Sequence, residues 1–295
     1  MRWGILGAAD IARKALLPAI AASRNGAIVA MASREPERAK AMLYPYPEAR
    51  ACSTYEDLIA DESVEAIYIP LVNSLHLEWS VRALEAGKHV LCEKPLAMNA
   101  HEAETMAGAA KRSGKLLMEA FMYRMHPDTS SFIKSIAEPI HVQASFGFNL
   151  HDLANYRLRA ELGGGALLDV GCYAVNVSRW ILGEPVDISA RLHMNDAVDM
   201  TVSALLEFSE GRTASIWASF ESPEEQQLRV IAKDIVHARA RPFTSRHDPW
   251  DPYQIMVESF GDSILDGRPQ PIPIEGSIAN MRVLDRIREV ATQAG

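Results

Sequence analysis

The first part of the chain alternates between short apolar runs and segments with helical spacing, and this alternation constrains the fold more than any other feature. The apolar runs are Arg2–Leu6, Ala27–Ala32, Ala66–Ile69, His89–Cys92 and Leu116–Ala120. Helix ends between them are indicated by capping pairs, Thr54 with Asp57 and Asn99 with Glu102, and by Gly87 and Gly114 where C-caps belong. Strands that alternate with helices form a parallel sheet with helices on both faces. The first half is therefore predicted to be a doubly wound α/β domain.

After residue 123 the pattern changes to a glycine-rich turn and helix, Gly163–Leu182, followed by long segments of strand character. The strand candidates are His141–Asn149, Val186–Met194, Val198–Phe208, Thr213–Phe220 and Gln227–Ala232, with a hairpin signal at Ser209–Gly211. The simplest interpretation is a meander, which predicts an α+β domain with an open, mostly antiparallel sheet. One face of such a sheet must be covered by helices or by another subunit.

We therefore expect two domains, residues 1–123 and residues 124–295. The tail returns to helical spacing at Tyr253–Leu265 and Ser277–Thr292, and a helix there could pack back on the first domain. The open sheet predicts a homodimer or higher homo-oligomer. Residues 1–123 hold 14 basic and 15 acidic residues, a balance of −1, and residues 124–295 hold 16 and 23, a balance of −7. This asymmetry suggests two halves with different functions.

Composition excludes several classes of partner. The net charge of the 295-residue chain is −8, opposite in sign to what a nonspecific nucleic-acid binder needs. The three cysteines, Cys52, Cys92 and Cys172, are widely spaced, so neither a disulfide framework nor a zinc cluster is indicated. We find no secretory leader and no run of about 18 apolar residues that would cross a membrane. These features together predict a cytoplasmic protein.

The end of the first apolar run could bind a dinucleotide. The segment Gly4–Ala12 passes from a strand directly into a helix, and it fits Gly-x-Gly-x-x-Gly at positions 7, 9 and 12 with alanine at the last two. A tight turn brings the backbone close to a pyrophosphate, which the N–H groups and the dipole of the helix stabilise. The predicted cofactor-binding residues here are Gly7, Ala8, Ala9, Asp10 and Ile11. The alternative is an ordinary strand–turn–helix without a ligand.

The end of the second apolar run should show which dinucleotide binds. In this position an acidic side chain suits the ribose hydroxyl of NAD, and a basic one suits the 2′-phosphate of NADP. The sequence reads Ser33-Arg34-Glu35, and a hydroxyl beside a guanidinium suits a phosphate. Ser33 and Arg34 therefore favour NADP. One alternative is NAD, with Glu35 as the ribose ligand. Another, nearly as common for any one of these residues, is a solvated charged loop that binds no cofactor.

Two further segments contain candidates for chemistry. Glu93-Lys94-Pro95 ends a strand, where Lys94 would project toward the ligand crevice of a parallel sheet. In Gly163–Asn176, a helix from about Ala166 places Asp169 and Tyr173 at i and i+4. A phenol needs a nearby cation to exchange protons near neutral pH, and Lys94 and an oxidised nicotinamide would both supply one. Asp169 is better suited to orienting the lysine or the substrate. The alternatives are that Lys94 is simply an exposed side chain after a strand, and that the helix with Asp169 and Tyr173 has only a packing role.

These segments, in this order, resemble the glucose-fructose oxidoreductase/inositol dehydrogenase family, over essentially the whole chain. The tail helix with Asn280 and Asp285 is part of the likeness, whereas Ala9 and Ala12 depart from the glycines of the family. Tyr173 after the Gly163–Asp169 element is similar to the branch that contains dihydrodiol dehydrogenases and NADP-dependent xylose dehydrogenases. The resemblance implies a nucleotide-binding domain followed by an open-sheet domain.

The resemblance also extends to two more motifs. Asn73–His76 resembles the segment near the nicotinamide, so Asn73, His76, Glu93 and Lys94 are expected at the cofactor. Met118–Pro127 resembles the segment that bridges the domains beside the active site. The expected substrate-lining residues are Arg124, His126, Asn155, Tyr156 and Arg157.

Together the motifs predict an NADP-dependent oxidoreductase that moves a hydride between nicotinamide and a hydroxyl-bearing carbon of a sugar, polyol or cyclic diol. Lys94, Asp169 and Tyr173 are the expected catalytic residues, with Tyr173 as general acid/base. A noncatalytic regulator that binds NAD(P) on the same fold is the alternative. No metal is expected, because His76, His126, His151 and His247 lack the spacing of a metal site.

Overall fold

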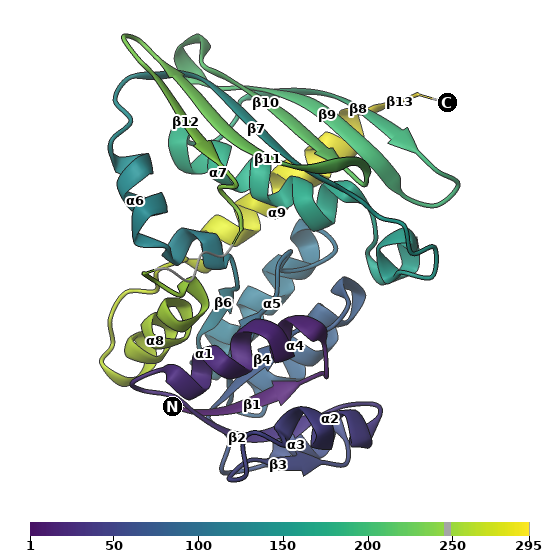
Figure 1. The fold of residues 1–295 in the computed structure, drawn as a ribbon, viewed down its shortest axis with the longest axis vertical. Helices are drawn as coiled ribbons and strands as arrows, with labels where there is room; N and C mark the ends of the chain where they lie inside the picture. The colour runs from purple at the N-terminus through teal and green to yellow at the C-terminus, as the bar shows by residue number, and fades with distance from the viewer. Residues whose placement is uncertain (245–248, 295) are drawn as a thin grey trace. The chain divides into compact units, whose positions relative to one another are not determined.

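A computed structural model describes residues 1–244 and 249–294 of the chain (Figure 1). They form two compact units, one of Met1–Leu96, His101–His126 and Ser245–Ser277, the other of Ala97–Ala100, Pro127–Thr244 and Ile278–Gly295. The predicted domains meet at one boundary, 123/124, whereas the chain passes between these units several times. Within the described ranges, no helix is long and apolar enough to cross a membrane.

The first unit contains a six-stranded parallel sheet in the order β3-β2-β1-β4-β5-β6, which confirms the predicted doubly wound fold. Its strands are β1 (Arg2–Leu6), β2 (Ala27–Ala32), β3 (Arg50–Cys52), β4 (Ala66–Ile69), β5 (His89–Cys92) and β6 (Leu117–Glu119). The sequence interpretation omitted β3, a three-residue edge strand too short to show a hydrophobic pattern. The strand order reverses between β1 and β4, so a ligand crevice is expected at the carboxyl ends of these strands.

Helices connect the strands of this sheet, and their ends follow the capping residues. The helical segments are η1 (Ala12–Leu16), α1 (Leu17–Ala22), α2 (Pro36–Leu43), α3 (Tyr55–Ala60), η2 (Asn73–Leu75), α4 (His76–Glu85), α5 (Ala100–Ser113), η3 (Met122–Met125) and α8 (Pro252–Leu265). Thr54 and Asp57 form the predicted capping box, with each side chain accepting from the other's backbone N–H. Gly87, two residues after the end of α4, and Gly114, directly after α5, have φ values of +80° and +67°, as predicted for residues that end helices.

Helix α8 belongs to the first unit although it follows the second sheet in the chain. The ring of Phe260 on α8 packs 5.7 Å from that of Trp3 on β1, and both side chains are completely buried. Asp262 accepts hydrogen bonds from Arg24 at 2.5 Å and from Asn25 at 2.8 Å. An aromatic contact and a charged anchor thus fix α8 against the start of the sheet.

The second unit contains a seven-stranded mixed sheet in the order β12-β11-β7-β10-β9-β8-β13. Its strands are β7 (Pro139–Asn149), β8 (Asp187–Met194), β9 (Asp199–Glu207), β10 (Thr213–Ser219), β11 (Glu221–Ala232), β12 (Val236–Ala240) and β13 (Thr292–Ala294). The predicted meander holds for β8, β9 and β10, which pair antiparallel. It is wrong for β7, which pairs parallel with β10 because a long connection with a helix lets the chain cross over. The open, mostly antiparallel sheet is confirmed.

One face of this sheet is covered by helices of its own unit (Figure 1). The helical segments are α6 (Pro127–Lys134), η4 (Tyr156–Leu158), η5 (Ala160–Leu162), η6 (Leu167–Gly171), α7 (Cys172–Leu182) and α9 (Ile274–Val290). Helix α7 packs on β7 and β10. The inward residues Val142, Ala144, Ile216 and Ala218 are at most 2% exposed. Alternate residues of the same strands remain accessible, as expected for a sheet with one solvated face.

Candidate active site

The turn after β1 has the geometry of a dinucleotide loop. Gly7 has a φ of +126°, and a Cβ there would lie 2.7 Å from Cδ2 of Leu71. Its N–H donates to the carbonyl of Ala32 at 2.9 Å, and the helix begins at Asp10. The positions of Ala9 and Ala12 show no positive φ, and Ala12 is completely buried. Only the first position of the motif needs glycine here, which explains how alanine is tolerated at the other two.

The loop after β2 presents the exposed side chain of Arg34. Ser33 is buried, and its Oγ accepts from the N–H of Glu35 at 3.2 Å. Arg34 is exposed, and within residues 1–244 and 249–294 its guanidinium makes no ion pair. Arg38 differs, because it donates to the carbonyl of Ala8 at 2.9 Å and lies 3.7 Å from the carboxylate of Glu35. Sequence reasoning missed Arg38, although its place one turn after Arg34 was visible.

The loop after β5 is anchored by the carboxylate of Glu93. One oxygen of this group accepts from the Tyr68 hydroxyl at 2.5 Å, and the other accepts from the N–H of Lys94 at 3.2 Å. Burial and the Glu93 carboxylate hold the pKa of Tyr68 well above its usual range, so its hydroxyl remains a donor. The next residues are held by Glu119, which accepts from the N–H of Leu96 at 2.9 Å. Lys94 is thus half-buried on a rigid loop, with a cis peptide bond before Pro95.

His76 connects this loop to the one after β4. The imidazole is completely buried, with Nδ1 2.9 Å from the carbonyl of Pro95 and Nε2 3.0 Å from that of Leu71. Burial lowers the pKa of His76, although the two carbonyls oppose this shift. Asn73, at the start of η2, is also buried. His76 therefore braces the Lys94–Pro95 segment, and its contact with a nicotinamide stays a prediction.

The two remaining candidates of the first unit, Arg124 and His126, lie at η3. Arg124 is half-buried in η3, and His126, which follows it, is 3% exposed. Their expected role at a substrate is not tested by these positions.

In the second unit, the glycine run is required by the groups that press on it. Gly163 has a φ of +81°. A Cβ at Gly164 would collide with the carbonyl oxygen of Arg157, and one at Gly165 would collide with the carboxylate of Asp199. The run therefore lets one loop and one strand approach the start of the helix that bears Asp169 and Tyr173.

Asp199, at the start of β9, caps the N-terminus of the helical segment that bears Asp169 and Tyr173, although it is distant from that segment in the sequence. Its Oδ2 accepts from the N–H of Leu167 at 2.6 Å, and the N–H of Ala166 also stabilises the carboxylate. Burial raises the pKa of Asp199 to about 6 despite these donors and the positive charge of Arg288. Sequence reasoning missed this cap because 32 residues separate it from the helix start.

We expect Asp199→Asn to remove a pH dependence of stability. Because the folded pKa of about 6 lies above the ordinary 3.8, the folded state holds the proton more tightly than the unfolded state. The free energy of unfolding should therefore fall as pH rises from about 4 to about 6, by roughly 3 kcal/mol from this group. Urea unfolding of both proteins across this range measures the difference. If the free energy of unfolding changes with pH in the same way in both proteins, the raised pKa of Asp199 is contradicted.

Asp169 is held by an ion pair. Arg157 Nε donates to Asp169 Oδ2 at 2.6 Å, and its guanidinium lies 4.9 Å from the ring centre of Tyr156. Burial opposes the charge of Arg157, but Asp169, Tyr156 and Tyr173 together raise its pKa above the usual value. Sequence reasoning placed Arg157 at the substrate and missed this pairing. The expected α-helical spacing of Asp169 and Tyr173 also differs, because Leu167–Gly171 is a wider π turn.

Tyr173 is buried in an aromatic cluster. Its ring centre lies 5.5 Å from that of Phe146 on β7 and 5.4 Å from that of Phe243, and the two phenylalanines stack on each other. The tail helix supports the turn, because Asn280 on α9 donates to the carbonyl of Cys172 at 3.3 Å. The side chain is 8% exposed, so most of the ring is removed from water.

The structure thus brings together two groups of predicted residues, one in each unit. Gly7, Ser33, Arg34, Asn73, Glu93 and Lys94 lie at or after the carboxyl ends of parallel strands. Asn155, Tyr156, Arg157, Asp169 and Tyr173 lie on the loop and helix of the second unit, with Asn155 Oδ1 accepting from the N–H of Arg157. Within the described residues, no three His, Cys, Asp or Glu side chains gather as metal ligands. His247 lies outside those residues.

Comparison with known proteins identifies the family of this chain. Residues 1–121 match the family described as "Oxidoreductase family, NAD-binding Rossmann fold", and residues 134–234 match the GFO/IDH/MocA C-terminal domain. The chain is 37% identical over 317 residues to a D-xylose 1-dehydrogenase (NADP(+)) of Haloferax volcanii, covering 99% of this chain and 97% of the relative. It is 30% identical to a trans-1,2-dihydrobenzene-1,2-diol dehydrogenase of Xenopus tropicalis, covering 87% and 78%.

A solved structure extends the likeness to three dimensions. A 3-ketoreductase from Actinomadura kijaniata, in complex with NADP and TDP-benzene, has a TM-score of 0.89 at 29% identity and covers 99% of this chain and 98% of its own. The parallel sheet and the open sheet correspond to the two domains that the family models match. The chain belongs to the glucose-fructose oxidoreductase/inositol dehydrogenase (GFO/IDH/MocA) family of oxidoreductases.

Proposed function

We propose that this chain is an NADP-dependent oxidoreductase that transfers a hydride between nicotinamide and a hydroxyl-bearing carbon of a sugar, polyol or cyclic diol. The observation that carries the proposal is Tyr173, which is buried on the same helical segment as the ion-paired Asp169, in a chain of an oxidoreductase family. A xylose dehydrogenase and a dihydrodiol dehydrogenase among the relatives support the substrate class.

The residues of the first unit fit a dinucleotide. Gly7, Ala8, Ala9, Asp10 and Ile11 would hold the pyrophosphate at the turn and the helix start. Ser33 and Arg34 would hold a 2′-phosphate, with Arg38 as a second cation. Glu35 faces Arg38, which makes it a weaker ribose ligand and NAD the less favoured cofactor. Asn73, His76, Glu93 and Lys94 are proposed for the nicotinamide side. The nicotinamide supplies or accepts the hydride, as it does in other enzymes.

Tyr173 is the proposed general acid/base, because its hydroxyl can accept the proton of a substrate alcohol or return one to a carbonyl. Phe146 and Phe243 exclude water from its ring, which strengthens the action of nearby charges. Lys94 is proposed as the cation of the first unit that favours the phenolate. Asp169 is proposed to fix the geometry of neighbouring cations or of the substrate.

The loop of the second unit supplies donors suited to a hydroxyl-rich substrate. Tyr156 and Arg157 are half-buried there, and Asn155 shapes the turn that holds them. Arg124 and His126 are proposed as further lining residues from the first unit. Substrates rich in hydroxyl groups are selected by several such polar contacts.

The function is tested by assaying a panel of aldoses, polyols and cyclic diols with NADP and with NAD. We expect turnover of at least one substrate, followed by the absorbance of the reduced cofactor. A protein that binds NADPH and turns over no member of the panel would support the noncatalytic regulator instead.

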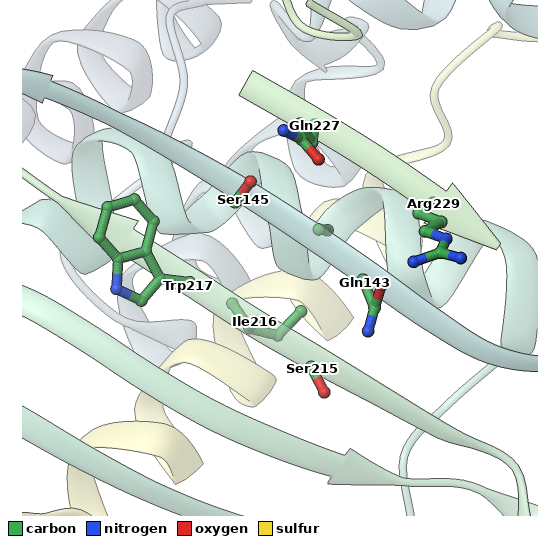
Figure 2. A pocket seen from close by; sticks show the side chains of 8 residues that line it. Gln143, Ser145, Ser215, Ile216, Trp217, Gln227 and Arg229 are labelled. Carbon is green, nitrogen blue, oxygen red and sulfur yellow. The ribbon is translucent and has the colours of Figure 1, made fainter. Parts of the chain in front are cut away.

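We also propose that the solvated face of the open sheet forms a homo-oligomer, a homodimer in the simplest case. Figure 2 shows a shallow hollow on this face, lined by side chains from β7, β10 and β11. Trp217 lies there among small polar side chains such as Ser145 and Ser215, which leave room for a partner to approach. Leu205 on β9, which is 37% exposed, pairs with Ser215 in the sheet. A partly exposed tryptophan such as Trp217 is typical of the centre of an interface.

Sedimentation velocity tests this assembly. We expect the wild type to sediment as a dimer or larger, and Trp217→Arg to shift it toward the monomer by burying an unpaired charge in the interface. Trp250→Arg is the matched control, since Trp250 is also exposed but lies outside the sheet. A wild type that stays monomeric at every concentration would remove the proposal.

A further inference from the structure

The tail helix α9 holds the segment of chain that follows the Lys94 loop. Asp285 on this helix accepts from the N–H of Ala100, the first residue of α5, at 2.7 Å. Arg288, three residues further on, donates to the carbonyl of Met98 at 3.0 Å and lies 3.9 Å from the carboxylate of Asp285. A carboxylate and a guanidinium of one helix therefore bind two backbone groups of the same short segment.

This α9-bound segment, Ala97–Ala100, belongs to the second unit, although the chain on both sides of it belongs to the first. Ala97 is completely buried and Ala100 is 9% exposed. The N–H of Ala100 is one of the amides at a helix start that have no partner inside the helix. A carboxylate suits such an amide, because the hydrogen bond is charge-assisted and the helix dipole is positive there. Asp285 thus stabilises the start of α5 from 185 residues away in the sequence.

Lys94 precedes the α9-bound segment by three positions, and the stretch between them is tightly held. The carbonyl of Pro95 lies 2.9 Å from Nδ1 of His76. The N–H of Leu96, which is completely buried, donates to Glu119 at 2.9 Å. A stretch this short that contains a proline has few dihedral angles to absorb a shift. A displacement of the α9-bound segment would therefore be transmitted to Lys94.

The same helix also supports the segment that bears Tyr173. Asn280 on α9 is completely buried, and it donates to the carbonyl of Cys172 at 3.3 Å. Its side-chain oxygen accepts from Nη1 of Arg179 at 3.1 Å. Within the second unit, α9 thus binds the backbone directly before Tyr173 as well as the segment that follows the Lys94 loop.

We propose that Asp285 is a positioning residue, which together with Arg288 holds Lys94 where the chemistry needs a cation. This inference rests on the proposed function, in which Lys94 favours the phenolate of Tyr173. Orientation of this kind matters for the rate, since a misplacement of about 1 Å can cost about 10²-fold. The tail helix is then part of the catalytic framework of the chain and not only a cover for the second sheet.

Hydrogen exchange of the Ala100 amide tests the contact without cofactor, substrate or turnover. Asp285→Ala should exchange this amide about 10- to 100-fold faster, because a hydrogen bond to a charged group is lost. Asp285→Asn keeps an acceptor in the same place and should restore most of the protection. Glu289→Ala is the matched control, since Glu289 is an exposed carboxylate on the same helix, and it should exchange as the wild type does. Unchanged exchange in Asp285→Ala overturns the inference.

A double-mutant cycle tests whether the contact acts through Lys94. Asp285→Ala should lower kcat on the best substrate of the panel roughly 10- to 100-fold, and Asp285→Asn much less. In the Lys94→Ala background, Asp285→Ala should cause little further loss, because the group that it positions is already absent. A residue that only supports the fold costs the same in both backgrounds. Equal losses in the two backgrounds, or no loss in either, overturn the positioning role.

Arg288→Met is the second variant, because it releases the carbonyl of Met98 and leaves the cap at Ala100 in place. It enters the same cycle, with the same expected outcome, if thermal unfolding shows that Asp285→Ala does not fold. If Lys94→Ala turns over substrate as the wild type does, the proposed role of Lys94 fails and the positioning role fails with it. Faster exchange in Asp285→Ala would still support the contact between α9 and the α9-bound segment.

Discussion

Tyr173→Phe is expected to lose most of kcat while it keeps its affinity for NADPH. The substitution removes one hydroxyl and leaves the ring between Phe146 and Phe243, so the helix and the cluster should remain folded. General acid/base catalysis typically contributes about 10²- to 10⁴-fold to a rate, and we expect a loss within that range. The measurement compares kcat on the best substrate of the panel with NADPH binding followed by fluorescence titration.

Tyr44→Phe serves as the control for this experiment, because Tyr44 is 89% exposed at the end of α2 and should not affect turnover. Turnover close to that of the wild type in Tyr173→Phe would exclude the phenol as the proton-transfer group. A parallel loss of NADPH affinity would instead point to a disturbed fold.

Arg34→Ala is expected to change which cofactor the protein prefers. A hydrogen bond to a charged group contributes about 1.5–3 kcal/mol, so kcat/KM for NADP should fall roughly 10- to 100-fold. The value for NAD should barely change, because NAD has no 2′-phosphate for the guanidinium to bind. Steady-state kinetics with both cofactors at two salt concentrations measure the effect, and high salt should shrink the difference between wild type and variant.

Arg112→Ala provides the matched control, since Arg112 is an exposed arginine on α5 near the carboxylate of Glu85. Both cofactors should retain their kinetics in it. If Arg34→Ala weakens NADP and NAD equally, Arg34 does not recognise the phosphate, and Ser33 with Arg38 would have to do so alone.

The sheet of the first unit followed closely from its sequence. Ile67, Tyr68 and Ile69 are buried in a parallel strand, and such strands appear as continuous apolar runs because helices cover both faces. Thr54 with Asp57, and Gly87, marked helix ends correctly since caps depend on neighbours a few residues away. The parallel pairing of β7 with β10 could not be seen, because residues that pair across 72 positions leave no local signal.

For the candidate site too, features that depend on local sequence could be predicted, and contacts between distant segments could not. Gly7, Arg34, Lys94 and Tyr173 could be named from the sequence, because each follows from a short motif or from the end of a predicted strand. The partners that hold them could not be named. His76 bonds the backbone at Pro95, Asp199 caps the helix at Leu167, and these contacts arise only when distant segments fold together.

What the sequence determined by itself is the alternation of strands and helices in the first unit, the family resemblance and a set of candidate site residues, since these depend on local spacing. The tertiary structure decided their environment. Asp169 pairs with Arg157 because the glycine run Gly163–Gly165 allows the loop to approach the helix, and Asp199 becomes a buried cap for the same reason. Charge, burial and hydrogen bonding around a group are set by neighbours in space, and those neighbours are chosen by the packing of the whole unit.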